Sequence, residues 1–150
     1  MEQFDFGEGL VPAHQHPIGG GWVADTAHVA STAYVGPTAQ VFGSAQVLGF
    51  AQVLNCARIF GSAYVAERAH IYNNAHVYDN AQVLGYAHIG GFAHVYGSAC
   101  VRGAAFVSGF AQVHGLAMVS GHVSILDKAI VRGDARVSGD LKLYDFMLVY

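Results

Sequence analysis

Charged residues are scarce in this sequence. Asp, Glu, Lys and Arg make up only 11% of the 150 residues, and the formal net charge is −3. A chain with so few basic residues lacks the positive surface with which proteins bind nucleic acids, so we expect no DNA or RNA polymer as a partner. Hydrophobic residues make up 53% of the chain, which excludes an intrinsically disordered protein.

Long apolar runs are also absent. Glycines or polar residues interrupt every hydrophobic stretch before it reaches the roughly 18 residues of a membrane-spanning helix, so we expect no membrane association. Residues 1–17 are acidic and lack the apolar segment of a secretory signal. The length fits one domain, or one protomer of an assembly.

A six-residue repeat occupies most of the chain. In steps of six from Val23, every position up to Leu143 is aliphatic, and the residue two positions earlier is Ala from Ala27 through Ala117. Two positions after each aliphatic residue, Gly, Asn or Asp is most frequent. The unit is therefore Ala-x-Val-x-Gly-x, and about twenty copies follow one another without an insertion.

This unit predicts a short strand followed by a corner. In a strand, Ala and Val point to one side and the residue between them points to the other. Gly, Asn and Asp tolerate the left-handed backbone conformation of a tight corner. Such a short strand buries its apolar side only when copies stack on one another. Three hexads, or about eighteen residues, would then form one coil of an all-β solenoid with an Ala and Val core.

The repeat resembles the hexapeptide-repeat family over residues 22–143. This resemblance implies a left-handed parallel β-helix of about seven coils, and assembly as a homotrimer. The unbroken tandem is similar to chains encoded in bacterial and phage genomes. That similarity implies a cytoplasmic protein, in the host cytoplasm if phage-encoded, with a role such as sequestering a host signalling nucleotide or inhibiting a host protein.

Two segments lie outside the repeat, at residues 1–21 and 144–150. Both contain apolar residues, and an uncapped solenoid end exposes strand edges and an open core. We expect these segments to cap the two ends as an N-terminal arm and a C-terminal apolar strand. The alternative is that one of them packs on a neighbouring protomer.

Residues 18 positions apart should stack on one face, about 4.8 Å from each other. One such column is aromatic, and it lies beside a column that contains Arg58, His76 and His94. Four aromatic rings in register indicate either a packed surface at a subunit interface or a platform for a planar ligand. The aromatic column consists of Phe42, Phe60, Tyr78 and Tyr96.

Four histidines, His70, His76, His88 and His94, should flank one corner in two adjacent coils. They would supply hydrogen bonds at an interface, contact a ligand, or bind a metal. The γ-class carbonic anhydrases are built on the same type of helix and hold zinc with histidines between subunits. This sequence departs from them, because it lacks their Arg-x-Asp pair and their histidine spacing. We therefore expect no metal.

The two cysteines, Cys56 and Cys100, are 44 positions apart, which is not a multiple of 18. They should occupy a corner and a face, so a disulfide between them is not expected. Two free thiols fit a reducing compartment.

We expect a non-catalytic homotrimeric module that uses no cofactor. It would bind a small nucleotide-like or aromatic ligand, or a partner protein, between its subunits. Two alternatives stay open: a coenzyme A-dependent acyltransferase, as the family resemblance implies, and a structural scaffold or fibre segment. The expected ligand-binding or interface residues are Phe42, Arg58, Phe60, His70, His76, Tyr78, His88, His94 and Tyr96.

Overall fold

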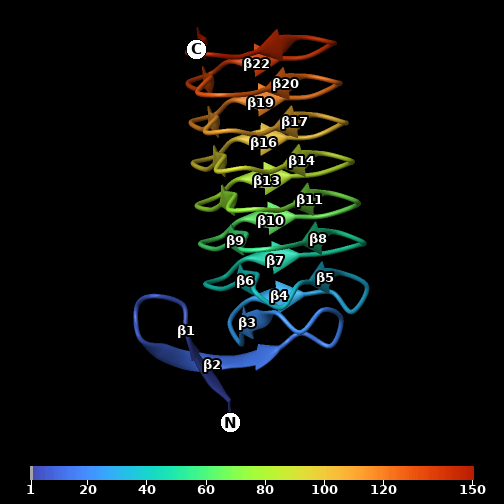
Figure 1. The fold of residues 1–150 in the computed structure, drawn as a ribbon, viewed down its shortest axis with the longest axis vertical. Helices are drawn as coiled ribbons and strands as arrows, with labels where there is room; N and C mark the ends of the chain where they lie inside the picture. The colour runs from blue at the N-terminus through green and yellow to red at the C-terminus, as the bar shows by residue number, and fades with distance from the viewer. Residues whose placement is uncertain (1) are drawn as a thin grey trace.

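Each hexad forms one two-residue strand and one corner in the computed structural model, which describes residues 2–150. The chain is a parallel β-solenoid of about seven coils of about 18 residues, preceded by an antiparallel hairpin (Figure 1). The expected all-β solenoid is therefore confirmed. Within residues 2–150, no helix is long and apolar enough to cross a membrane.

The strands form three sheets, one for each side of the solenoid. The ten-stranded sheet contains β1 (Gln3–Asp5), β2 (Leu10–Gln15), β3 (Trp22–Ala24), β6 (Gln40–Val41), β9 (Arg58–Ile59), β12 (His76–Val77), β15 (His94–Val95), β18 (Gln112–Val113), β21 (Ile130–Val131) and β24 (Leu148–Val149). The β4–β22 sheet contains β4 (His28–Val29), β7 (Gln46–Val47), β10 (Tyr64–Val65), β13 (Gln82–Val83), β16 (Cys100–Val101), β19 (Met118–Val119) and β22 (Arg136–Val137). The β5–β23 sheet contains β5 (Tyr34–Val35), β8 (Gln52–Val53), β11 (His70–Ile71), β14 (His88–Ile89), β17 (Phe106–Val107), β20 (Ser124–Ile125) and β23 (Lys142–Leu143).

Backbone hydrogen bonds join each coil to the next. In the hexad that begins at Ala63, the amide of Tyr64 donates to the carbonyl of Ala81 at 2.9 Å. The amides of Ala66 and Arg68 also donate to the next coil, at 3.0 and 2.9 Å. Alternate amides along the strand and through the corner therefore bond to the next coil, which explains how two-residue strands suffice to hold the sheets together.

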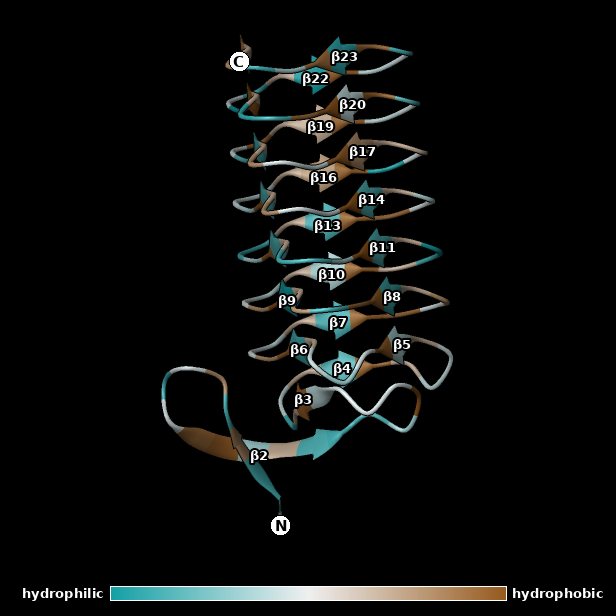
Figure 2. Cartoon of the chain, in the orientation of Figure 1, coloured by the Kyte–Doolittle hydropathy of each residue, from teal (hydrophilic) through white to brown (hydrophobic). Residues whose placement is uncertain are grey.

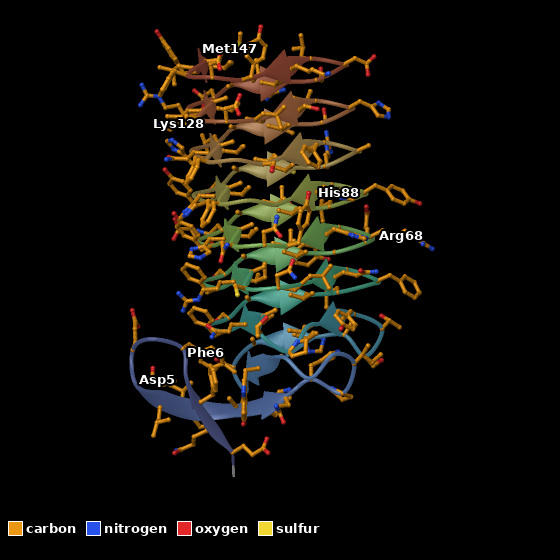
Figure 3. The ribbon with its side chains drawn as sticks, viewed as in Figure 1. Asp5, Phe6, Arg68, His88, Lys128 and Met147 are labelled. Carbon is orange, nitrogen blue, oxygen red and sulfur yellow. The ribbon has the colours of Figure 1, made fainter. Side chains whose placement is uncertain are left out.

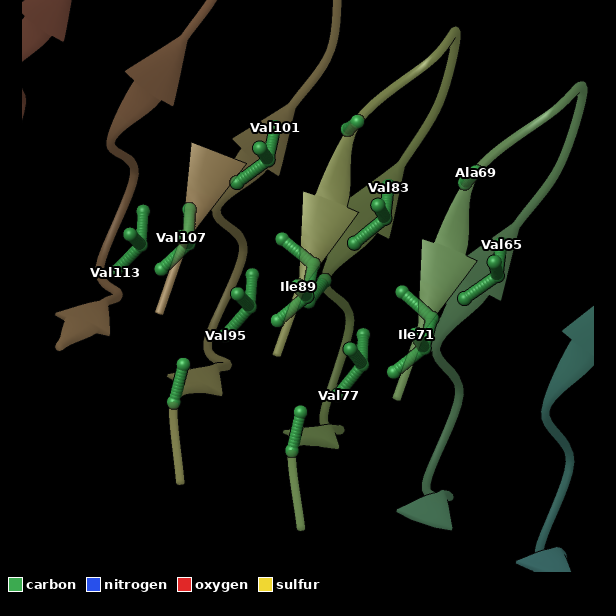
Figure 4. Close-up of a cluster of buried hydrophobic side chains, with 14 of the residues drawn as sticks. Val65, Ala69, Ile71, Val77, Val83, Ile89, Val95, Val101, Val107 and Val113 are labelled. Atoms are coloured by element: carbon green, nitrogen blue, oxygen red, sulfur yellow. The ribbon is translucent and has the colours of Figure 1, made fainter. Parts of the chain in front are cut away.

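The core consists of the repeated Ala and Val positions. In the middle coils their side chains are fully buried, and four isoleucines (Ile59, Ile71, Ile89 and Ile125) are the largest of them. Figure 4 shows these side chains converging inside the coils. Most two-residue strands pair one outward residue with one inward apolar residue, as the hydropathy colours of Figure 2 show. Within residues 2–150, the buried residues of the main core cluster are all Ala, Val or Ile.

Non-glycine residues at several corners use their side chains to bond to the next coil. Asp79 has a φ of 57°, and its Oδ2 accepts a hydrogen bond from the amide of Gly97 at 3.2 Å. Asn55, with a φ of 55°, accepts from the amide of Asn73 at 3.1 Å. Asn and Asp adopt this conformation more readily than other non-glycine residues. Here the side-chain oxygen also accepts a hydrogen bond from a backbone amide at the corner of the next coil.

The N-terminal segment covers strand edges of the first coil. Strand β2 pairs antiparallel with β1 and β3, and lies across one end of the solenoid (Figure 1). The amide of Val35 donates to the carbonyl of Ile18, and the amide of Gly21 donates to that of Val35, at 3.1 and 2.9 Å. His16 is buried, with its Nε2 2.9 Å from the carbonyl oxygen of Ala33. The segment thus supplies partners to backbone groups that the solenoid itself leaves open.

The C-terminal residues continue the parallel strand pairing at intervals of 18 residues. Ile130 pairs with Leu148 and Val131 pairs with Val149 in the parallel sense. Residues 144–150 therefore add one more corner and strand to the repeat. The cysteines lie where expected, with Cys56 exposed at a corner and Cys100 half-buried on β16, and both thiols are free.

Replacing Gly103 by Ala tests the corner geometry. Gly103 has a φ of +73°, and an added Cβ would lie 2.7 Å from the backbone nitrogen of Gly121. We expect Gly103→Ala to lower the free energy of unfolding by about 1–2 kcal/mol or more, because the left-handed conformation penalises a Cβ and the coil above must move. Urea denaturation followed by circular dichroism measures this change.

The matched control is Gly36→Ala. Its φ lies outside the left-handed region, and the nearest atoms to an added Cβ are at 3.5 Å. We expect a change within about 0.5 kcal/mol. Equal effects of the two substitutions would contradict the role assigned to the corner.

Candidate functional site

The nine residues expected from the sequence lie on two sides of the solenoid. Two of them, His70 and His88, belong to β11 and β14 of the β5–β23 sheet. The other seven lie on or directly after strands of the ten-stranded sheet. These are Phe42, Arg58, Phe60, His76, Tyr78, His94 and Tyr96. The structure therefore brings together seven residues on one face and places the other two around a corner.

The aromatic column is a continuous stack of rings. The ring centroids of Phe42 and Phe60 are 4.9 Å apart, those of Phe60 and Tyr78 4.8 Å, and those of Tyr78 and Tyr96 5.0 Å. The interplanar angles are only 1–4°. A ligand ring inserted between two of them would need about 7 Å, twice the carbon–carbon contact distance. The ring faces are therefore occupied by one another, which favours the packed-surface interpretation of the column.

The hairpin extends this stack at its lower end. Phe6 is buried, and its ring lies 4.9 Å from that of Phe42 at an angle of 20°. Arg58 holds the hairpin in place, because its Nη2 donates to the carbonyl oxygen of Phe6 and its Nε donates to Oε1 of Gln40 at 3.2 Å. Its guanidinium carbon also lies 4.9 Å from the Phe42 centroid. Arg58, expected as a ligand contact, thus already has four partners within the chain, since its guanidinium also lies over the ring of Phe60.

His76 and His94 stack beside the aromatic column. Their ring centroids are 4.9 Å apart, and Nδ1 of His94 lies 3.2 Å from the hydroxyl of Tyr78. Burial lowers the pKa of His76, and the neighbouring His94 and Arg58 lower it further. Burial also lowers the pKa of His94. Both rings are therefore mainly uncharged at neutral pH.

A groove lies on the neighbouring β5–β23 sheet, along His70 and His88. The two imidazole centroids are 4.9 Å apart and the rings are stacked at 28°. Burial lowers the pKa of His70, and His88 lowers it further. The groove has a volume of about 320 Å³. Its remaining wall residues are Thr32, Tyr34, Phe50, Gln52, Arg68 and Tyr86.

The side wall of this groove consists of three corner residues, Phe50, Arg68 and Tyr86. The guanidinium carbon of Arg68 lies 5.4 Å from the Phe50 ring centroid, and the aromatic side chains are 58% and 62% exposed. Figure 3 shows Arg68 projecting from its corner on the same side of the molecule as His88. Sequence reasoning missed this wall, although the spacing of 18 residues between its members is the signal that could have found it.

The histidines of the column and the groove have no carboxylate partner within residues 2–150. The histidine–carboxylate pairs found there are His14 with Asp25, at 2.8 Å, and His122 with Asp140, at 3.6 Å. The same range contains no cluster of three or more His, Cys, Asp or Glu side chains arranged to hold a metal. The chemistry that the groove offers is therefore stacking, hydrogen bonding and one fixed positive charge.

The fold and the groove define a parallel β-solenoid with a polar, aromatic-walled surface site. No protein-family model matches the chain, and neither the curated proteins nor the solved structures include a significant match.

The histidine stacks predict that the protein loses stability in mild acid. The pKa of His76 and of His94 lies below the ordinary value of 6.5 in the folded chain. As the pH falls through 6.5 the unfolded chain binds more protons than the folded chain, so the free energy of unfolding decreases until the pH is below the folded pKa values. We expect a lower urea midpoint at pH 5.5 than at pH 7.5.

The double variant His76→Gln/His94→Gln should show a smaller difference between the two pH values. His28→Gln is the control, because it removes an exposed histidine of β4 outside both stacks. An unchanged pH dependence in the double variant would contradict the assignment.

Proposed function

We propose that this protein is a non-catalytic binding module of the hexapeptide-repeat type. It assembles as a homotrimer and captures a small nucleotide-like ligand in the groove along His70 and His88. A partner subunit covers the open side of this groove. In this proposal the aromatic column packs and stiffens the ten-stranded sheet, and the neighbouring face carries the ligand.

The composition of the groove is the observation that carries the proposal. Arg68 supplies a charge that suits a phosphate group, and the imidazoles of His70 and His88 add hydrogen-bonding groups. Gln52 offers both a donor and an acceptor to a base edge. The ring of Tyr86, which is 62% exposed, has free surface for stacking, and the ring of Phe50, over which Arg68 lies, is 58% exposed. A volume of about 320 Å³ is at the lower end for small-molecule sites, which begin at about 300 Å³.

Exposed aromatic rings support an interface on the same side. Between residues 50 and 110, five of them lie on the β5–β23 sheet or on its two bordering corners. A monomeric protein rarely exposes so many together, and aromatic residues are enriched at subunit interfaces. These residues are Phe50, Tyr86, Phe92, Phe106 and Phe110, which are 36–62% exposed.

Binding is favoured over acyl transfer by the surroundings of the histidines. A histidine that acts as a general base is normally oriented by a second group, most often a carboxylate. His70 stacks on His88, and neither histidine has a carboxylate within 4.0 Å among residues 2–150. The groups present therefore suit recognition of a ligand better than proton transfer.

Light scattering tests the assembly. We expect a mass of three times the 15.8 kDa of one chain, and a shift towards the monomer in Phe106→Glu, because a buried unpaired charge disrupts an apolar interface. The control is Leu116→Glu, which alters an exposed residue at the corner that follows the ten-stranded sheet. A monomeric wild type would contradict the trimer, and open-ended polymers would favour the scaffold alternative.

Calorimetric titration with the four common nucleoside 5′-monophosphates tests the ligand class. We expect at least one of them to bind, and Arg68→Gln to weaken it by about tenfold or more, because a charged hydrogen bond contributes about 1.5–3 kcal/mol. Arg102→Gln should leave the affinity unchanged, since this exposed arginine follows β16 on another sheet.

Tyr78→Ala tests whether the nucleotide binds in the groove or on the aromatic column. If the nucleotide binds in the groove, this substitution should leave its affinity nearly unchanged. Absence of binding, or binding that depends on Tyr78 and not on Arg68, would contradict the proposed site.

A further inference from the structure

A second cavity lies between the hairpin and the first coils, away from the groove. It has a volume of about 420 Å³. Its walls come from the hairpin on one side, with Phe6, Val11 and Pro12, and from the first two coils on the other, with Ala24 and Phe42. We call it the hairpin cleft. Figure 3 shows Phe6 between the hairpin and the coils above it.

The hairpin cleft is apolar because it borders a small second core. Phe6, Ala13 and Ala24 are buried in that core, and Phe42 packs against it. Val11 remains 39% exposed at the wall of the cleft, so apolar surface stays accessible to a solute. Concave apolar surface at the junction of two structural units is the usual setting of a small-molecule site.

The turn that forms the outer wall is held in shape by its own hydrogen bonds. Oδ1 of Asp5 accepts from the amides of Gly7 and Gly9, at 2.7 and 2.9 Å. These bonds lower the pKa of Asp5, so the carboxylate remains charged and the turn remains closed at neutral pH. Arg58 ties the same turn to the solenoid through the carbonyl of Phe6. The cleft is therefore built before any ligand arrives.

The charged residues of the hairpin cleft are both acidic. They are Glu8 and Asp25, while the guanidinium of Arg58, beside the cleft, bonds to the carbonyl oxygen of Phe6 and lies over the ring of Phe42. Asp25 pairs with His14 at 2.8 Å, whereas Glu8 has no ion-pair partner within 4.0 Å among residues 2–150. The ring of Phe42 has Phe6 and Phe60 on its two faces. A bound cation would therefore be stabilised by a carboxylate and not by that ring face.

We infer that the hairpin cleft is a binding site for a small organic monocation with an aromatic or branched apolar body. The apolar body lies against Phe6, Val11 and Phe42, and the ammonium group pairs with Glu8. This ligand is opposite in charge to the one proposed for the groove and binds different residues. The two sites can therefore be tested separately.

Nuclear magnetic resonance titration of the ¹⁵N-labelled protein tests this inference. The probe is 2-phenylethylammonium, and 3-phenylpropanoate is a probe of similar shape with the opposite charge. Each is added to about 10 mM, because so small a ligand is expected to bind in the millimolar range or tighter. We expect the cation, and not the anion, to shift the amide signals of Glu8, Val11, Ala24 and Gly43.

Two pairs of variants locate the contacts. Glu8→Gln should lower the affinity for the cation at least fivefold. Glu2→Gln, which changes an exposed acid of the same hairpin region, should leave that affinity unchanged. Val11→Ser should also weaken it, while Leu10→Ser, at a residue that is 67% exposed and outside the cleft, should not. Hydrogen exchange of the Gly7 and Gly9 amides, which donate to Asp5, at rates close to those of the wild type shows in each variant that the turn is still folded.

Three results would overturn the inference. They are equal responses to the cation and the anion, shifts spread over residues outside the cleft, and an affinity that neither Glu8→Gln nor Val11→Ser reduces. Because the groove is not involved, a failure here leaves the nucleotide titration unaffected, and the reverse also holds.

Discussion

The hydrogen bonding of each coil to the next is the constraint on which the whole structure depends. Every parallel strand pair joins residues that are 18 positions apart, such as Val65 with Val83. Because strands of two residues contribute few bonds each, stability comes from the repetition of the same bonds over about seven coils. An inserted residue would move every later side chain out of its column, which explains why the hexad continues without interruption from residue 23 to residue 143.

The same register determines what the outer surface can do. Residues in one column are held at the spacing of the strands, so aromatic side chains in a column stack on each other, as Phe60 and Tyr78 do at 4.8 Å. A column of rings that stack in this way stabilises a face but has little free ring surface left for a ligand. Where a charged side chain separates the rings, as Arg68 separates Phe50 from Tyr86, the rings do not stack on each other and stay more than half exposed, although Arg68 lies over the ring of Phe50. A packed face therefore differs from a binding face in whether a column contains successive aromatic residues or aromatic residues separated by a charged one.

Reading columns at intervals of 18 residues predicted much of this arrangement from the sequence. It predicted the stack from Phe42 to Tyr96 and the pairing of His70 with His88, because each depends only on the repeat and on strand spacing. It did not predict that Phe6 continues the stack, since residues 1–21 lie outside the repeat. The position of Arg58 was expected, but its bond to the carbonyl of Phe6 depends on a contact between residues 52 positions apart.

The sequence by itself determined the solenoid, the inward and outward positions, the corners and the membership of each column. A short period and a fixed strand geometry are enough for all of these, since every hexad contacts equivalent hexads. Only the tertiary structure decided where the non-repeated hairpin lies, which partners Arg58 takes and where concave surfaces form. The residues of the groove follow from the columns of the repeat, but the hairpin cleft needs side chains from the hairpin and from the first coils to meet. Formation of the hairpin cleft depends on the path of the chain and on side-chain packing, which no local pattern in the sequence encodes.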